Sequence, residues 1–396
     1  MMIPEKEAES PLQPLPPVPC ESFLSIPNEI AVNYVARISK MYYPSLSLVS
    51  KTFHSLISSP DLYAERSRLG TTESCLYICL RSTNVPFTPR WFSLWVKPNR
   101  NQTDGRIMEK SSGNLFVPLT NPFPPYSNST VVVGSEIYVI GATMYDDLEP
   151  SSDVRVYDCR SHTWRNVPNM KRERRNAFAC VLDEKIYVMG GCSCYDKYSS
   201  WFEMFDIKTR TWRNLPVIPD IHVRLAYDGN MDGVEGKIYV KDCRRQGWIY
   251  DVNEGRWSVE EIRYSSTYWW WPKYWCVIGD LIYCYSYFGY IWYDLEAKRW
   301  TRLEGMEGLM KFCRIQGPRN TTFAQSMVGL VNYGGKLAVL WYRSVGEKKN
   351  IWCAVVKLEI CHNGNGREIS GKVEWVDVVL TVDNSYDVLC CLAIPI

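Results

Sequence analysis

A recurring aspartate and tryptophan pair constrains the fold of this 396-residue chain more than any other feature. In four segments an aromatic residue and an aspartate are followed, six residues after the aspartate, by a tryptophan. The pairs are Asp158 and Trp164, Asp206 and Trp212, Asp251 and Trp257, and Asp294 and Trp300. Successive tryptophans lie 48, 45 and 43 residues apart, and a turn followed by an apolar strand precedes each aspartate. Four copies in register indicate a repeat architecture.

The length of the repeat predicts an all-β propeller of six blades. The clearest repeats span residues 129–176, 177–223, 225–263 and 273–306, and one weaker unit flanks them on each side. A period of 43 to 48 residues with about four short strands is that of a propeller blade. A blade cannot bury both of its faces without neighbours, so we expect one propeller over residues 74–396.

The N-terminal part of the chain follows other patterns. Residues 1–22 are rich in Pro, Glu and Ser, and their prolines exclude both helix and sheet, so we expect a disordered tail there. Over residues 23–70 the apolar residues recur at helical spacing, which predicts about three short helices. A unit this small buries too little surface to be stable alone, so its apolar face is expected to need a partner.

Charge and cysteine content exclude several classes of function. Lys and Arg total 45 against 43 Asp and Glu, so nothing attracts the whole chain to nucleic acid or to an anionic membrane. No stretch approaches 18 uncharged apolar residues and the N-terminus lacks a signal-peptide pattern, so we expect a cytoplasmic or nuclear protein, or one found in both. The 15 cysteines are odd in number and scattered, which predicts reduced thiols rather than a disulfide framework.

The sequence contains no recognisable catalytic or metal-binding pattern. Its four histidines lie far apart and none stands in a zinc motif. Cys192 and Cys194, like Cys75 and Cys79, lack the second pair of ligands that a zinc finger requires. No nucleophile elbow, P-loop or dinucleotide fingerprint is present. We therefore expect no catalysis, no metal and no cofactor, whereas an enzyme built on this scaffold would show bound metal.

A basic cluster between two predicted blades is a candidate for target recognition. Arg172, Arg174 and Arg175 lie between the last strand of one repeat and the first strand of the next, where propellers often bind partners. Three interpretations remain open: a recognition surface, a solvated loop, or a nuclear-import or nucleic-acid patch that Glu173 dilutes.

A run of three tryptophans is the second candidate. Trp269, Trp270 and Trp271 cannot all face one side of a strand, so at least one is exposed or caps the hub of the propeller. An exposed tryptophan is costly unless it contacts a partner. Contact with a substrate and packing between blades both remain open for this run.

The repeats and the helical unit resemble two known families. The segment from Ser25 to Phe53 resembles an F-box and the blades resemble kelch repeats, in the order found in plant F-box/kelch-repeat proteins. The kelch resemblance is strongest from Val181 to Trp212, which contains Gly190 and Gly191. It implies structural roles: the glycines let the second strand approach its neighbours, and the tryptophans wedge between adjacent sheets.

The F-box resemblance also implies a partner and a function. F-boxes dock on the adaptor Skp1, called ASK in plants, which bridges to a cullin and a ubiquitin-conjugating enzyme. The residues that match this docking motif are Ile26, Pro27, Ile30, Leu46, Leu48, Val49 and Phe53. The alternative is that they only pack the helices on one another or on the propeller.

The resemblance as a whole implies the substrate-recognition subunit of an SCF-type ubiquitin ligase. Its propeller would bind a target protein that the sequence does not identify. The alternative is a propeller that scaffolds or sequesters a partner without ubiquitination.

Overall fold

A computed structural model gives the structure of the chain. It describes residues 26–84, 89–97, 113–119, 127, 129–141, 150–161, 163–192, 201–219, 231–241, 247–260, 275–286, 289–313, 315–316, 322–323, 327–363 and 366–396. The predicted tail of residues 1–22 lies outside the described residues, and so does the tryptophan run at 269–271.

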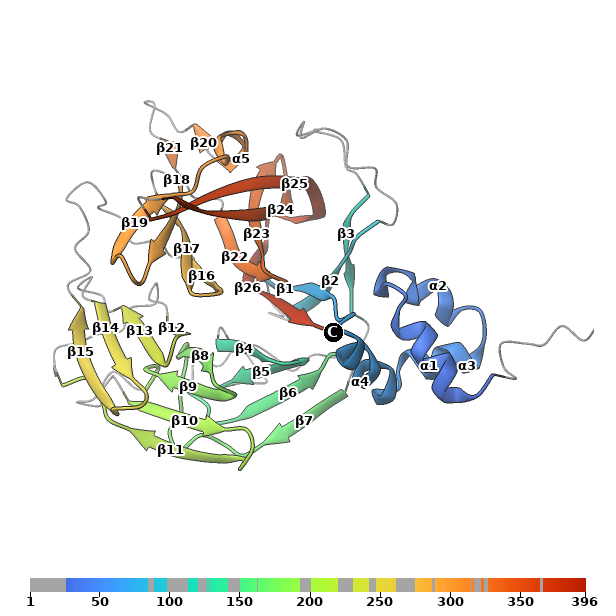
Figure 1. Ribbon diagram of the computed structural model, residues 1–396, viewed down its shortest axis with the longest axis horizontal. Coiled ribbons are helices and arrows are strands. Elements are labelled where there is room, and N and C mark those ends of the chain that lie inside the picture. The colour runs from blue at the N-terminus through green and yellow to red at the C-terminus, as the bar shows by residue number, and fades with distance from the viewer. Residues whose placement is uncertain are drawn as a thin grey trace, which may run out of the picture.

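The N-terminal helices form a small domain at the rim of a ring of sheets (Figure 1). Its elements are α1 (Asn28–Ala36), η2 (Lys40–Tyr42), α2 (Tyr43–Ser47), α3 (Lys51–Ile57) and α4 (Pro60–Leu69). The sequence explains their ends, because the Ser50 and Ser59 hydroxyls accept hydrogen bonds from the first turns of α3 and α4. Gly70 ends α4 in the left-handed conformation. Val35, Leu56 and Leu62 lie in the core of this domain.

Six four-stranded antiparallel sheets form the ring, so the prediction of a six-bladed propeller is confirmed. From the innermost strand outward, blade 1 contains β26 (Tyr386–Pro395), β1 (Ser74–Ser82), β2 (Pro89–Trp95) and β3 (Leu115–Pro118). Blade 2 contains β4 (Ser129–Val133), β5 (Glu136–Ile140), β6 (Val154–Asp158) and β7 (Thr163–Val167). Blade 3 contains β8 (Phe178–Leu182), β9 (Lys185–Met189), β10 (Phe202–Asp206) and β11 (Thr211–Leu215). Blade 4 contains β12 (Met231–Val234), β13 (Lys237–Lys241), β14 (Gly247–Asp251) and β15 (Arg256–Glu260). Blade 5 contains β16 (Trp275–Ile278), β17 (Leu281–Ser286), β18 (Gly289–Asp294) and β19 (Arg299–Arg302). Blade 6 contains β22 (Met327–Tyr333), β23 (Lys336–Val345), β24 (Lys348–Asn363) and β25 (Gly366–Asp383). A short helix, α5 (Glu307–Cys313), and a two-stranded sheet of β20 (Ile315–Gln316) and β21 (Thr322–Phe323) lie between blades 5 and 6 in the chain.

The repeated aspartates and tryptophans build the outer hairpins of blades 2 to 5. Asp206 ends β10, and its carboxylate accepts hydrogen bonds from the backbone N–H groups of Lys208 and Thr209, both at 3.0 Å. Trp212 lies opposite Phe205 on the neighbouring strand, with ring centroids 5.0 Å apart. The repeats at Asp158, Asp251 and Asp294 show the same turn and the same aromatic pair.

The tryptophans also connect neighbouring blades. The indole N–H of Trp212 donates to the carbonyl of Pro168, which follows the outer strand of blade 2, at 2.7 Å. Trp257 of blade 4 donates in the same way to Pro216 of blade 3, also at 2.7 Å. These two indoles therefore anchor blades 3 and 4 to the blade that precedes each of them.

A glycine is required where two connections between strands meet. A Cβ atom on Gly191 would lie 2.7 Å from the carbonyl oxygen of Arg175, and one on Gly141 would lie 2.8 Å from that of Arg174. Both glycines have positive φ angles, +72° and +66°. A side chain at either position would collide with the backbone of the connection that leads into β8.

The last strand of the chain closes the ring. β26 is antiparallel to β1, with the register running from Ser74 opposite Pro395 to Ser82 opposite Tyr386. Blade 1 is thus built from both ends of the propeller segment, which holds the ring together without a free edge between first and last repeats. No repeat motif in the sequence predicts this strand.

Candidate functional site

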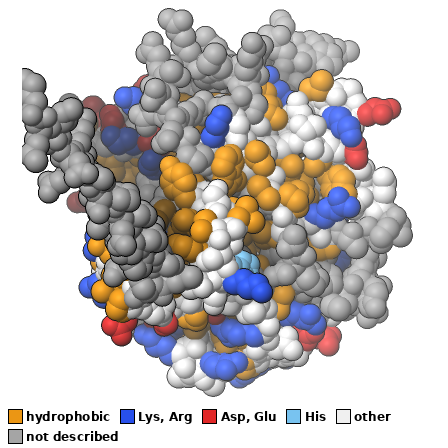
Figure 2. Space-filling model, turned by 90° about the vertical axis from the view of Figure 1, so that its right-hand side faces the viewer, with side chains coloured by type: hydrophobic (Ala, Val, Ile, Leu, Met, Phe, Trp, Pro, Cys, Tyr) orange, Lys and Arg blue, Asp and Glu red, His pale blue; other side chains and the backbone are white. Residues whose placement is uncertain are grey.

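The helical domain exposes an apolar face. The side chains of Ile30, Tyr34, Leu48 and Val49 are 46%, 61%, 87% and 65% exposed. Viewed towards the helical end of the molecule, apolar side chains gather on the surface (Figure 2). Apolar side chains this exposed on a domain that already has its own core are typical of an interaction surface. We call these four residues the apolar face.

The predicted adaptor-binding residues divide into two groups. Pro27, like Ile30, Leu48 and Val49, is exposed, whereas Ile26 is half-buried. Leu46 and Phe53 are half-buried against the core of the helical domain. These last two therefore support the helices that carry the apolar face. Tyr34 was not among the predicted site residues, although it stands four residues after Ile30 on the same helix.

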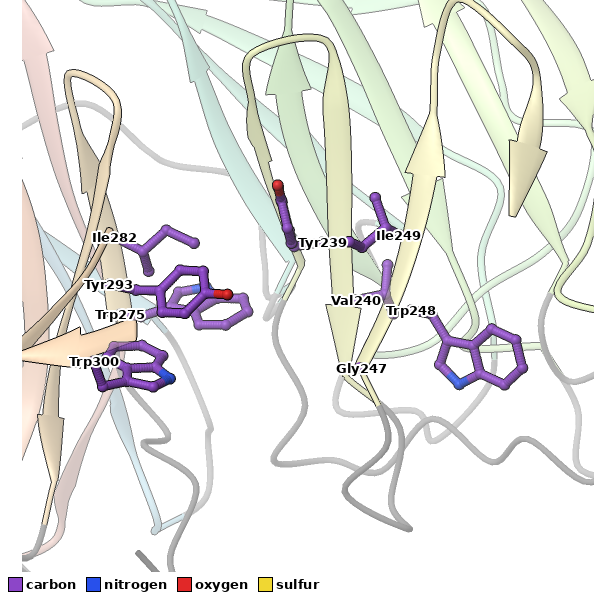
Figure 3. A pocket seen from close by; sticks show the side chains of 9 residues that line it. All are labelled: Tyr239, Val240, Gly247, Trp248, Ile249, Trp275, Ile282, Tyr293 and Trp300. Atoms are coloured by element: carbon purple, nitrogen blue, oxygen red, sulfur yellow. The ribbon is translucent and has the colours of Figure 1, made fainter. Parts of the chain in front are cut away.

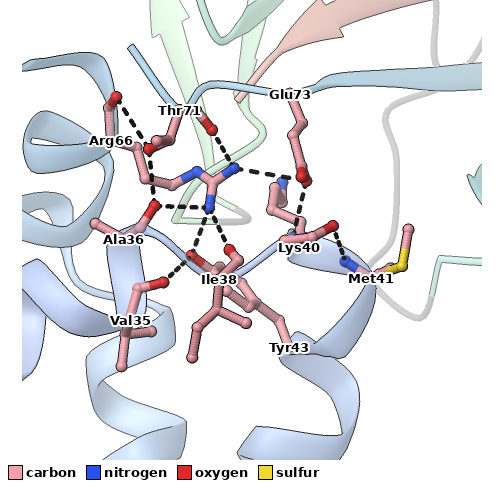
Figure 4. Close-up of polar contacts among 10 residues, drawn as sticks. Val35, Ala36, Ile38, Lys40, Met41, Tyr43, Arg66, Thr71 and Glu73 are labelled. Carbon is pink, nitrogen blue, oxygen red and sulfur yellow. Dashed lines mark hydrogen bonds and ion pairs between the residues drawn. The ribbon is translucent and has the colours of Figure 1, made fainter. Parts of the chain in front are cut away.

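A buried arginine fixes the helical domain to the propeller. Arg66 is 1% exposed, and its guanidinium donates to the carbonyls of Ala36 at 3.2 Å and Ile38 at 2.7 Å and to the Tyr43 hydroxyl at 3.0 Å (Figure 4). It also donates to the carbonyl of Thr71, in the segment that leads into β1. One side chain thus joins α1, the segment that follows it, α2 and the connection to blade 1.

Glu73 completes this joint from the propeller side. Its carboxylate accepts a hydrogen bond from the backbone N–H of Lys40 at 2.8 Å and lies 3.5 Å from the Arg66 guanidinium (Figure 4). Its backbone exchanges two hydrogen bonds, each 2.9 Å long, with Ile396, the last residue. The helical domain is therefore bound to the strand pair that closes the ring. We call the contacts of Arg66 and Glu73 the domain joint.

A groove lies beside the domain joint, between the helices and blades 1 and 6. It encloses about 900 Å³, and its lining includes Tyr43, Ile57, Leu94, Val117 and Trp375. The indole N–H of Trp95 donates to the carbonyl of Met41 at 3.4 Å, which connects the two parts of the molecule at this position. The groove is more apolar than polar, so it presents packing surface rather than a site for chemistry.

Arg174 was predicted to contact a target, and the structure corrects this prediction. The residue is 1% exposed, and its guanidinium donates to the carboxylate of Glu203 at 2.6 Å and to the carbonyls of Gly190 and Trp201 at 2.6 and 2.9 Å. Its backbone pairs with Ser151. Every one of these partners is internal, so the side chain links blade 2 to blade 3 and is not available to a partner protein.

The other two arginines of the basic cluster remain on the surface. Arg172 is exposed and its guanidinium lies 4.3 Å from the ring centroid of Trp201, while Arg175 is half-buried. Both belong to the connection from β7 to β8. Connections of this kind, from the outer strand of one blade to the inner strand of the next, emerge on one face of the ring. β1 is the second strand of its blade and runs antiparallel to the inner strand, so it begins at the opposite face of the ring. The chain therefore enters the propeller from the helical domain at the face opposite to the connection that carries Arg172 and Arg175.

A pocket between blades 4 and 5 is lined largely by aromatic side chains. Trp248, Trp275, Tyr293 and Trp300 are among the residues that surround it (Figure 3). Its free volume is about 10 Å³, which is at the lower limit for a single water molecule. The pocket is therefore a packing defect between blades rather than a binding site for a ligand.

The described part of the chain contains neither a cluster of metal ligands nor a helix that could span a membrane. Among the described residues, no three His, Cys, Asp or Glu side chains come close enough together to hold a metal ion. Within the same ranges, no helix combines the length and the apolar character needed to cross a lipid bilayer.

Comparisons with known proteins agree with this architecture. The model of the F-box domain matches residues 23–65, and the model of the FKB95 kelch-repeats domain matches residues 91–380. The chain is 47% identical over its whole length to all of the F-box/kelch-repeat protein At4g29370 of Arabidopsis thaliana. It is 40% identical to At4g19330 of the same organism, with 98% of this chain and 95% of that protein covered. The chain belongs to the F-box/kelch-repeat protein family of plants.

Proposed function

We propose that this protein is the substrate-recognition subunit of an SCF-type ubiquitin ligase. The helical domain docks on a Skp1-type adaptor, ASK in plants, which connects it to a cullin. The propeller holds a target protein, so that lysines of the target lie near the ubiquitin-charged enzyme. The contribution of this chain is proximity, and other subunits carry the chemistry. This agrees with its family, whose members are generally non-catalytic adaptors.

The apolar face carries this proposal. Ile30, Leu48 and Val49 are exposed although the helical domain already has a core of its own. Burying such side chains against a partner stabilises a complex by about 25 cal/mol for each Å² of apolar surface removed from water. The match of residues 23–65 to the F-box domain supports a Skp1-type protein as that partner.

Capture on immobilised adaptor tests the docking. The double variant Pro27→Ala and Leu48→Ala removes two exposed side chains that do not stabilise the domain core. Central interface side chains contribute about 2 kcal/mol or more each, so we expect the affinity to fall at least tenfold. A matched control replaces Val345 and Ile360, which are exposed on the propeller, by Ala. The control is expected to bind like the unaltered protein, and undiminished binding of the double variant would contradict the docking.

Ubiquitination itself needs a separate measurement. Cullin should co-purify with the unaltered protein through the adaptor and be lost with the double variant. A version lacking residues 26–70 should still capture targets, and those targets should persist in cells. If captured proteins are equally long-lived with and without the helical domain, the protein does not direct its targets to degradation.

For target recognition we propose the face of the ring that carries Arg172 and Arg175. These side chains keep at least part of their surface accessible, and Arg172 over Trp201 presents a planar cation next to an aromatic ring. Arginine and tryptophan dominate many protein interfaces. The tryptophan run at 269–271 stays a candidate for the same role. Substitution of Arg172 and Arg175 by Ala should reduce target capture while leaving adaptor binding unchanged.

A further inference from the structure

The seam that closes the propeller contains two cysteines in direct register. Cys79 of β1 is the partner of Cys390 of β26. Their thiols are hydrogen-bonded to each other, and neither is in a disulfide. Directly opposed residues of antiparallel strands have Cα atoms about 4.5 to 5.5 Å apart, within the range of about 4.4 to 6.8 Å that disulfides span. The register shifts directly after this pair, between Cys79 and Leu80, but the two cysteines themselves are directly opposed.

The surroundings of Cys390 favour its thiolate form. It accepts hydrogen bonds from the Cys79 thiol, from the Thr130 hydroxyl and from the backbone N–H of Cys79, and these lower its pKa even though burial opposes them. Burial raises the pKa of Cys79 and of the adjacent Cys391. Because the thiolate is the nucleophilic form of cysteine, Cys390 reacts before its neighbours.

We propose that Cys79 and Cys390 form a reversible disulfide that locks the closing strand of the propeller, with a hydroperoxide as the oxidant. The Cys390 thiolate attacks one peroxide oxygen, the O–O bond breaks, and the other oxygen leaves as hydroxide or alkoxide. The sulfur of Cys79 then attacks the resulting sulfenic acid, forming the S–S bond and breaking the S–O bond. The thiol proton of Cys79 leaves with that oxygen as water. With hydrogen peroxide, two thiols and one oxidant give one disulfide and two waters.

The position of the pair gives the bond its effect. The two cysteines connect the first and last strands of the ring, so the disulfide encloses most of the propeller in one covalent loop. A cross-link of this kind restricts the unfolded chain, and restricts it more for a long loop. β26 ends at Pro395, and the next residue, Ile396, pairs with Glu73 in the domain joint. The disulfide therefore secures the ring and the attachment of the helical domain together.

The neighbouring Cys391 provides a matched control. It stands next to Cys390 on the same strand but packs with the side chains of β1 that face blade 6, such as Ile78 and Leu80. Cys79 and Cys390 pack on the opposite side, towards blade 2. Cys391 is opposite Ile78 and has no cysteine partner in the register.

The test treats the folded full-length protein with hydrogen peroxide and maps its disulfides by mass spectrometry of unreduced peptides. We expect the Cys79–Cys390 link in the unaltered protein and in Cys391→Ser, its absence in Cys390→Ser and Cys79→Ser, and its removal by dithiothreitol. The linked protein should unfold in urea about tenfold or more slowly than the reduced protein. Peroxide should leave the unfolding rate of Cys390→Ser unchanged.

Two results would overturn the proposal. One is that peroxide oxidises Cys390 to the sulfinic acid in the folded unaltered protein without a link to Cys79. The other is that the link forms only after urea has unfolded the chain. Both are read from the unaltered protein, so they remain decisive if a serine variant fails to fold.

Discussion

At the scale of single residues, burial separates arginines that stand next to each other in the sequence. Arg174 forms a buried ion pair with Glu203, with side chains 0% and 1% exposed, while Arg172 lies two positions earlier at the surface. The sequence shows only a basic cluster. It does not show that Glu203, on the next blade, lies where it can pair with one of the arginines.

Removal of Arg174 should therefore destabilise the propeller. Arg174→Ala leaves the Glu203 carboxylate buried without its cation, which typically costs about 3–5 kcal/mol. Arg172→Ala, which removes only a contact at the surface, should cost at most about 1 kcal/mol. Urea unfolding of both variants measures the difference. Equal losses would show that the buried ion pair does not stabilise the junction of blades 2 and 3.

A half-buried carboxyl in β12, that of Asp232, makes stability depend on pH. Burial raises the pKa of Asp232 to about 7, while the N–H of Gly233, 2.9 Å from the carboxylate, lowers it by less. The folded protein therefore retains a proton that the unfolded chain releases at about pH 4, so stability falls as the pH rises from about 4 to 7. Asp232→Asn should remove this dependence.

Unfolding free energies of the protein and of Asp232→Asn, measured from pH 5 to 8, check this. The advantage of the variant should grow with pH by up to about 1.4 kcal/mol per unit and level off above pH 7. Glu235→Gln, an exposed carboxylate in the turn after β12, is the control. A difference between protein and variant that stays constant with pH would contradict the prediction.

At the scale of the element, the outer hairpins were predictable and the closing strand was not. The aspartate and tryptophan positions depend on local geometry, a turn and a pair of adjacent strands, so their spacing alone locates the hairpin. β26 pairs with β1 across almost the whole propeller, and its sequence lacks the repeat motif. The long hairpin of β24 and β25 reaches blade 5. There the backbone N–H of Gly371, in β25, donates to the carbonyl of Glu304 at 2.8 Å, which is also a long-range contact.

For the apolar face, too, the sequence indicates which helices are involved but not which of their side chains are exposed. The resemblance pointed to helices that carry exposed apolar residues, but exposure distinguishes Leu48 from Leu46, which stands two positions earlier and packs inwards. Helical spacing separates such neighbours only when the helix bounds are known to within a residue, and in short helices they are not.

The tryptophan contact between blades predicts a graded loss of stability. Trp212→Phe keeps an aromatic ring opposite Phe205 but loses the hydrogen bond to Pro168, so it should cost about 1 kcal/mol. Trp212→Ala also removes the ring from the core and should cost about 3–5 kcal/mol. Thermal and urea unfolding give both values. If Phe is as harmful as Ala, the hydrogen bond rather than the ring is the dominant contact.

At the scale of the whole molecule, the domain joint sets the distance and orientation between the apolar face and the propeller. In the proposed ligase role this chain acts by proximity, so the joint must be rigid to hold adaptor and target at a fixed distance and orientation. Here the Glu73 carboxylate accepts a hydrogen bond from the backbone N–H of Lys40 in the helical domain, and the Glu73 backbone pairs with Ile396 of the propeller. Rigidity at this point rests on one carboxylate that contacts both Lys40 and Arg66.

Glu73→Ala should loosen the joint without unfolding either part. The backbone pair with Ile396 does not need the side chain, and Arg66 keeps its bonds to Ala36, Ile38 and Tyr43. Small-angle X-ray scattering should show a broader distribution of dimensions, and limited proteolysis should cut faster near residues 70–73, while adaptor binding persists. Asp383→Ala, which removes an exposed ion pair with Lys348 in blade 6, is the control and should behave like the unaltered protein. Scattering and proteolysis unchanged in Glu73→Ala would mean that packing across the groove, rather than the carboxylate, holds the two parts in place.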